Sequence, residues 1–197
     1  FIAAKPLRVI ATGAALVCAV GVWDDLRGMK ALPKLTFEFL LAAFMWLNGL
    51  RVERVTLPTG QTLDLGTILA PAADLGAARA VAGALGDWAV IGAVALSLAI
   101  TIFWYALLMN AINLIDGLDG LAASVSAVSA VVIVMISTAI NHPPPFAVAL
   151  AGGLTAAVCL GFLKHNWHPA TIFMGDAGAL QLGFLLASIS LLSSTKS

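Results

Sequence analysis

Five of the ten acidic residues in this 197-residue chain lie in three short polar segments. These segments are VWDDLRG at 22–28, NAINLIDGLDGLA at 110–122 and FMGDAGA at 173–179. Each adjoins a long apolar run and contains glycine, which suits close approach of a backbone to a ligand. Carboxylates at the ends of apolar membrane segments are costly, and they usually bind a cation or take part in chemistry. We therefore expect the three segments to contribute to a functional site.

Asp24 and Asp25 form the first acidic cluster. Adjacent carboxylates at a helix end point in different directions, so one can bind a cation while the other handles a proton. Their mutual repulsion would raise the pKa of one of them, which suits a base. The alternative is an ordinary solvated loop, because Arg27 and Lys30 follow closely.

Four polar residues recur every three positions in the second segment: Asn110, Asn113, Asp116 and Asp119. Residues three apart on a helix are neighbours, so these side chains can act together. Asn and Asp also favour helix ends, which offers a structural alternative. Two Asn, two Asp and two Gly within eleven residues exceed what a cap requires, so this pattern favours a ligand site.

Asp176 precedes the apolar run Ala177–Leu192. It could be the N-cap of a helix, or it could hold a cation beside an anion bound at that helix end. Mg²⁺ is typically bound by one or two carboxylates together with substrate phosphates. The spacing alone leaves both interpretations open.

The composition identifies the class of protein. The chain is 61% hydrophobic and 10% charged, whereas soluble domains contain about 25% charged residues. We therefore expect an integral membrane protein. A net charge of zero gives no indication of nucleic acid binding, and Cys18 and Cys159 lie in apolar runs as small buried hydrophobes.

The hydropathy pattern predicts an all-α polytopic membrane protein with about six transmembrane helices, since a span needs about 20 apolar residues. The predicted spans are Val9–Trp23, Leu35–Leu50, Trp88–Met109, Leu121–Ile140, Phe146–Leu163 and Ala177–Leu192. Their polar connections would contain the acidic segments.

Two other connections have a different character. Arg51–Leu65 alternates partly around Pro58-Thr59-Gly60 and predicts a small extracytoplasmic β-hairpin, and Asn141–Pro145 predicts a tight proline turn. Counting crossings places the three acidic segments on one membrane face and these two connections on the other. The distribution of Lys and Arg does not decide which face is cytoplasmic.

Basic and aromatic residues flank the acidic segments. Lys34 could neutralise a phosphate, although such a residue is often an interfacial anchor. Phe173 could stack on a nucleobase, although an aromatic belt is the common alternative. His165 and His168 are spaced as a weak candidate metal pair.

The acidic segments, with NWHPATIFMGD at 166–176, resemble the polyprenyl-phosphate N-acetylhexosamine-1-phosphate transferases. That family includes the undecaprenyl-phosphate N-acetylglucosamine-1-phosphate transferases and the phospho-N-acetylmuramoyl-pentapeptide transferases. The resemblance implies transfer of an amino-sugar phosphate from a UDP-sugar to polyprenyl phosphate, releasing UMP and forming a lipid diphosphate sugar for cell-envelope polysaccharides. It also implies Mg²⁺, with Mn²⁺ as an alternative, and a cytoplasmic site in the inner or plasma membrane.

The resemblance further implies roles for residues. Asp176 matches the Mg²⁺ ligand, with Asp116 as a second candidate, and Asp24 and Asp25 match a pair linked to the lipid phosphate, one of them a proposed base. Asp116 and Asp119 complete the candidate catalytic carboxylates. The candidate substrate-binding residues are Asn110, Asn113, Asn166, Phe173 and Lys34, with Asn166 and Phe173 as the uridine contacts.

The resemblance covers nearly the whole chain but only the middle of a ten- or eleven-span protein, about its third to eighth spans. We therefore expect residues 1–197 to be a single membrane domain of a longer protein. The family's His-rich motif lies in a later loop, and His165 and His168 do not replace it. A homodimer is compatible with the sequence, which does not give the oligomeric state.

The sequence also bears on other functions. The predicted hairpin and the short second segment favour an N-acetylglucosamine substrate over phospho-N-acetylmuramoyl-pentapeptide. A CDP-alcohol phosphotransferase is excluded, because Asp116-Gly117 is followed by Leu118-Asp119 and not by the signature of that class. An ion-coupled transporter would place its acids near the middle of the membrane, whereas these lie at span ends. An inactive membrane fragment is the remaining alternative.

Overall fold

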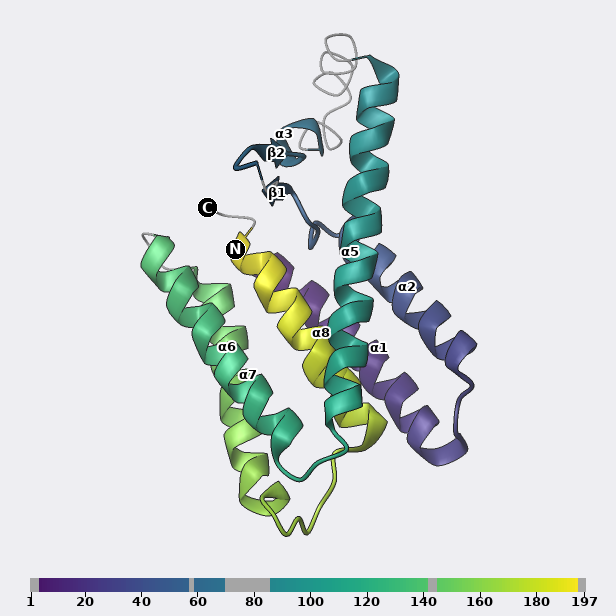
Figure 1. Cartoon of the computed structure of the whole chain (residues 1–197), viewed down its shortest axis with the longest axis vertical. Coiled ribbons are helices and arrows are strands. Elements are labelled where there is room, and N and C mark those ends of the chain that lie inside the picture. Colours follow the sequence, from purple (N-terminus) through teal and green to yellow (C-terminus); the bar gives the residue numbers. More distant parts are fainter. Residues whose placement is uncertain (1–3, 57–58, 70–85, 142–144, 195–197) are drawn as a thin grey trace.

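The computed structural model describes residues 4–56, 59–69, 86–141 and 145–194 (Figure 1). Six long helices make up most of this part: α1 Ala4–Arg27, α2 Ala31–Leu47, α5 Asp87–Ile115, α6 Leu121–Ile140, α7 Phe146–Asn166 and α8 Gly175–Ser194. A two-stranded ribbon of β1 Arg54–Thr56 and β2 Thr62–Asp64 precedes the short helix α3 Gly66–Leu69. The prediction of a helical protein with a small hairpin is confirmed.

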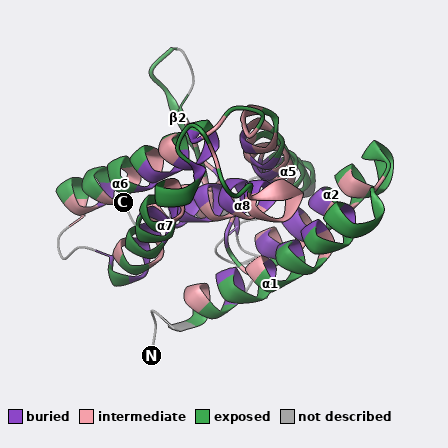
Figure 2. Cartoon of the chain, turned by 90° about the horizontal axis from the view of Figure 1, so that it is seen from below, coloured by how far each residue is buried: buried purple, intermediate pink, exposed green. Residues whose placement is uncertain are grey.

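Helix α8 lies at the centre of the bundle and packs against α1, α5, α6 and α7 (Figure 2). In its most apolar window 61% of the residues are buried, against 22–33% in the other candidate spans. Glycines permit this close packing, because a Cβ at Gly21 would come within 2.4 Å of Ala177 Cα and one at Gly183 within 2.5 Å of Met109 Cα. The helix that begins with Asp176 is therefore held on several sides.

Five helices of the described part are long and apolar enough to cross a membrane: α1, α5, α6, α7 and α8. This is an integral membrane protein. The sixth predicted span, Leu35–Leu50, is helical as α2, but α2 has 17 residues and includes Lys34 and Glu38. Seventeen helical residues extend about 26 Å, which is less than the roughly 30 Å hydrocarbon core. The predicted number of crossings is therefore not established.

The helices extend further into the polar segments than predicted. Asp24 and Asp25 lie in the last turn of α1, not in the loop that follows it, and Asn110 and Asn113 lie on α5. A helix continues past its apolar part as long as its backbone hydrogen bonds continue, and α1 ends only near Gly28, whose φ of +67° suits glycine. Several candidate residues are thus placed by rigid helices.

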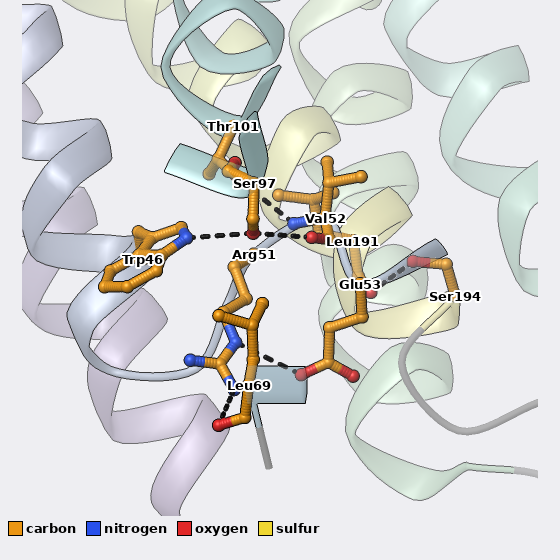
Figure 3. Close-up of polar contacts among 9 residues, drawn as sticks. All are labelled: Trp46, Arg51, Val52, Glu53, Leu69, Ser97, Thr101, Leu191 and Ser194. Atoms are coloured by element: carbon orange, nitrogen blue, oxygen red, sulfur yellow. Dashed lines mark hydrogen bonds and ion pairs between the residues drawn. The ribbon is translucent and has the colours of Figure 1, made fainter. Parts of the chain in front are cut away.

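The predicted hairpin is present, with Val55 paired to Leu63 in antiparallel register. Its preceding segment is anchored to α5 by polar contacts (Figure 3). Ser97 Oγ donates to the Val52 carbonyl at 2.7 Å, and the Val52 N–H donates to Thr101 Oγ1 at 3.0 Å. Pro58 and residues 142–144 of the predicted proline turn lie outside the described residues. The extracytoplasmic placement of the hairpin remains a prediction.

Candidate functional site

The α1–α2, α5–α6 and α7–α8 connections gather at one end of the bundle, opposite the hairpin (Figure 1). These connections and the adjoining helix ends contain the three acidic segments. The sequence prediction that the acidic segments share one face agrees with this arrangement. The candidate site is therefore assembled from three parts of the chain that are far apart in sequence.

Two carboxylates converge on one ammonium group. Lys34 Nζ of α2 lies 2.8 Å from Asp24 Oδ2 of α1 and 3.1 Å from Asp176 Oδ2 of α8. Asp24 is only 7% exposed, and its other oxygen accepts the backbone N–H of Met29. Because three helices supply these groups, their mutual positions depend on helix packing and not on loop conformation.

A polar cavity of about 380 Å³ adjoins this cluster. Its polar side chains are those of Asp24, Lys34, Asn110, Asn113 and Asp176. A volume of this size lies within the range of small-molecule sites, about 300–1,000 Å³. The structure therefore brings five of the predicted site residues around one space.

Asp25, the neighbour of Asp24, has different contacts and does not line this cavity. Its Oδ1 accepts the Asp176 N–H at 2.8 Å and its Oδ2 accepts the Ala177 N–H at 3.1 Å. Both carboxylate oxygens thus bind the first turn of α8, next to Gly175 with its φ of +63°. The two members of the predicted pair have separate structural roles.

Asn166 and Asp119 join two loops to each other. The Asn166 side chain, 4% exposed, accepts the Gly120 N–H at 3.0 Å and donates to the Ile172 carbonyl at 2.9 Å. Asp119 Oδ2 accepts the Ala170 N–H at 3.1 Å and lies 2.9 Å from His168 Nδ1. These contacts fasten the α5–α6 loop to the α7–α8 loop.

Two other predicted residues do not line the cavity. Asp116 is half-buried at the end of α5. Phe173 is 74% exposed on the α7–α8 loop. An exposed aromatic face at that place is available to a planar ligand, which is compatible with its predicted stacking role.

Burial, hydrogen bonds and neighbouring charges shift the pKa values of Asp116, Asp119 and Lys34. Burial, followed by the negative charge of Asp176, raises the pKa of Asp116 to about 6. The Ala170 N–H and His168 hold the pKa of Asp119 below its ordinary value. Burial lowers the pKa of Lys34, but its hydrogen bonds to Asp24 and Asp176 outweigh that effect and raise it.

The residues present fit a hard divalent cation. Within the described residues there is no group of three or more His, Cys, Asp or Glu side chains arranged for a metal ion. Mg²⁺ does not require one, because it commonly takes one or two carboxylates and completes its shell with water and phosphate oxygens. Asp24 and Asp176 already bind one positive charge between them, the Lys34 ammonium, so their arrangement favours a cation.

The sequence interpretation missed Glu38. This residue of α2 is 1% exposed and accepts a hydrogen bond from the Asn110 side chain. A signal for it was available, because a carboxylate within an apolar helical stretch, one turn after Lys34, is a functional candidate by default.

Comparisons with known proteins agree with the motifs. A sequence model of the group described as "Glycosyl transferase family 4" matches residues 7–194. The decaprenyl-phosphate N-acetylglucosaminephosphotransferase of Mycobacterium tuberculosis (strain CDC 1551 / Oshkosh) is 29% identical over 96% of this chain and 42% of its own length. The probable undecaprenyl-phosphate N-acetylglucosaminyl 1-phosphate transferase of Bacillus subtilis (strain 168) is 30% identical over 97% of this chain and 45% of its own length.

A third relative matches a shorter part. The phospho-N-acetylmuramoyl-pentapeptide-transferase of Nostoc punctiforme is 54% identical over 25% of this chain and 12% of its own length. The chain spans less than half the length of the two N-acetylglucosamine-type relatives. Since the family match extends over nearly all of the helical bundle, the chain belongs to glycosyl transferase family 4.

Proposed function

We propose that the intact protein transfers an N-acetylhexosamine-1-phosphate from a UDP-sugar to a polyprenyl phosphate, forming a lipid diphosphate sugar and UMP. The observation that carries the proposal is the convergence of Asp24 and Asp176 on Lys34 at the wall of a polar cavity. Transfer of a phosphoryl group between two anions requires charge neutralisation and alignment more than covalent assistance. A mixed cluster of carboxylates and an ammonium suits that requirement.

Each residue then has a task. Lys34 binds a phosphate oxygen, while Asn110 and Asn113 orient the donor by hydrogen bonding. Asp24 lines the cavity and Asp25 does not, so Asp24 is the member of the pair that faces the acceptor phosphate. Mg²⁺, held by Asp176 with Asp116 beside it, would supply positive charge to the diphosphate. The rigid helices α1, α2, α5 and α8 keep these groups aligned.

The donor is proposed to be UDP-N-acetylglucosamine. Two relatives that match more than nine-tenths of this chain carry N-acetylglucosamine in their names. UDP-N-acetylmuramoyl-pentapeptide is the second candidate, because a relative named for that substrate is more identical over a shorter region. We further propose that the site faces the cytoplasm, where nucleotide sugars occur, and that the product serves cell-envelope polysaccharide synthesis.

The test is an assay of the intact protein in washed membranes with undecaprenyl phosphate and Mg²⁺. UMP release with UDP-N-acetylglucosamine, and much less with UDP-N-acetylmuramoyl-pentapeptide, is the expected result. The reverse preference would support the second candidate. UMP release with neither donor would contradict the proposed function and favour a transporter or an inactive membrane protein.

A further inference from the structure

Glu38 is a buried carboxylate in a membrane protein. It lies on the face of α2 that also buries Leu41 and Met45, and it is 1% exposed. Removing a carboxylate from water costs free energy unless hydrogen bonds or ion pairs compensate for the lost hydration. The contacts of Glu38 therefore show whether its burial is explained by stability.

The contacts around Glu38 satisfy only one of its oxygens. Its Oε2 accepts the side-chain N–H of Asn110, whereas its Oε1 has no hydrogen-bond partner among the described residues. A buried acceptor without a partner destabilises a fold. Stability alone thus does not explain this side chain, and its single bond leads to a residue that lines the polar cavity.

The same contacts determine which end of the Asn110 amide faces the cavity. Asn110 Nδ2 donates to Glu38 and also to the Ala106 carbonyl at 2.8 Å. Both partners are oxygen acceptors, so both amide hydrogens are used and the nitrogen must be at that side. The carbonyl oxygen of Asn110 remains available as an acceptor.

We propose that Glu38 is a positioning residue: it holds the amide nitrogen of Asn110, so that Asn110 presents only its carbonyl oxygen to the ligand. This rests on the proposed function, in which the ligand is a UDP-sugar. An acceptor selects a hydroxyl or N–H group of the donor substrate and disfavours a phosphate oxygen. Lys34, one helical turn before Glu38, offers the opposite polarity and takes the phosphate.

The test compares Glu38→Gln, Glu38→Leu, Asn110→Leu and the double leucine variant in the intact protein, with UDP-N-acetylglucosamine as the probe. Glutamine keeps an oxygen acceptor, so Glu38→Gln should keep KM within about threefold of the wild type. Each single leucine variant should raise KM roughly tenfold with a smaller change in kcat, because a ground-state contact is lost. The double variant should be no worse than the poorer single one.

Three outcomes would overturn the proposal. Glu38→Gln could raise KM as much as Glu38→Leu does, or Glu38→Leu could have wild-type KM and kcat. The third is a double variant whose increase in KM is the product of the two single increases. Glu53→Leu is the matched control, because Glu53 pairs with Arg51 near the hairpin and should leave KM unchanged.

A second measurement does not depend on activity or on the leucine variants folding. Asn110→Asp places a carboxylate against Glu38 and should lower the thermal unfolding temperature of the detergent-solubilised protein. Adding Glu38→Gln supplies a side-chain N–H donor and should restore part of that loss. If the wild type releases no UMP, the proposed function is wrong, but the unfolding temperatures still test the Glu38–Asn110 contact. If Glu38→Gln does not raise the unfolding temperature of the Asn110→Asp protein, the proposed role of Glu38 is wrong.

Discussion

At the scale of single residues, Lys34 occupies the centre of the candidate site. Its ammonium bridges carboxylates from two other helices, at 2.8 Å from Asp24 and 3.1 Å from Asp176. In the proposed reaction the same ammonium faces phosphate oxygens. The positive charge of Lys34 thus neutralises the two carboxylates when the site is empty, and it would neutralise phosphate oxygens when the substrate is bound.

Replacing Lys34 should therefore impair the reaction itself. We predict that Lys34→Met lowers kcat/KM for the UDP-sugar roughly 100-fold, since a charged group that stabilises the developing phosphate charge is removed. Lys34→Arg should retain more activity because it keeps the charge. Lys30→Met is the control, because Lys30 is exposed in the neighbouring loop. Equal losses in the Lys30 and Lys34 variants would contradict this role.

The raised pKa of Asp116 predicts that the Mg²⁺ requirement of the reaction depends on pH. Burial and the charge of Asp176 raise its pKa to about 6, so this carboxyl becomes neutral as the pH falls through that value. A protonated carboxyl binds Mg²⁺ poorly, because proton and metal compete. The Mg²⁺ concentration for half-maximal UMP release should rise about tenfold per pH unit below pH 6. A requirement that is unchanged between pH 5.5 and 7.5 would show that Asp116 does not assist the metal.

At the scale of elements, the sequence predicted the number and order of the long helices but not where they end. Hydropathy marks the apolar part of a helix, whereas helical hydrogen bonding continues into polar turns. Hydropathy therefore predicts Asp24 and Asp25 in a loop, whereas both lie on α1 and Asp25 binds the N-terminus of α8. Sequence spacing gives no information about a contact between residues 151 positions apart.

The contact between Asp25 and α8 can be tested directly. We predict that Asp25→Ala destabilises the protein by about 0.5–2 kcal/mol, the usual cost of losing a helix cap. Asp25→Asn should cost less, because its one oxygen still accepts an N–H. Thermal unfolding in detergent measures both. If both variants were as stable as the wild type but neither released UMP, Asp25 would act in the chemistry and not as a cap.

The packing of α8 gives a second prediction at this scale. A Cβ at Gly183 would lie 2.5 Å from Met109 Cα, so Gly183→Ala should force α5 and α8 apart and destabilise the protein by about 1–3 kcal/mol. Gly161 on α7 is the matched control, since nothing lies within 4 Å of an added Cβ there. Gly161→Ala should be neutral or slightly stabilising. Similar unfolding temperatures for the two variants would contradict close α5–α8 packing.

At the scale of the whole molecule, the acidic segments share one end of a bundle organised around α8. Counting crossings predicted that arrangement from the sequence, because alternating spans return the chain to the same side. The cavity itself was not predictable, since it depends on how α1, α2, α5 and α8 pack. The contact of Glu38 with Asn110 and the contact of Asn166 with Gly120 were not predictable either, because each joins residues distant in the sequence.

This chain matches less than half the length of the two N-acetylglucosamine-type relatives. The activity is therefore a property to be measured on the intact protein. Within the described bundle, the structure assigns the polar cavity to four helices and the hairpin to the opposite end. Because the hairpin lies far from the cavity, replacing a carboxylate in the hairpin is a control for replacing one at the cavity.

The most direct test measures UMP release by intact protein carrying Asp176→Asn beside one carrying Asp64→Asn, at saturating Mg²⁺ and UDP-N-acetylglucosamine. Asp64 lies in the hairpin, far from the cavity in the fold. We predict that Asp176→Asn lowers the rate at least about 100-fold, whereas Asp64→Asn leaves it near the wild-type value. Wild-type UMP release by the Asp176→Asn protein would contradict the assignment of this cavity as the site of phosphate transfer.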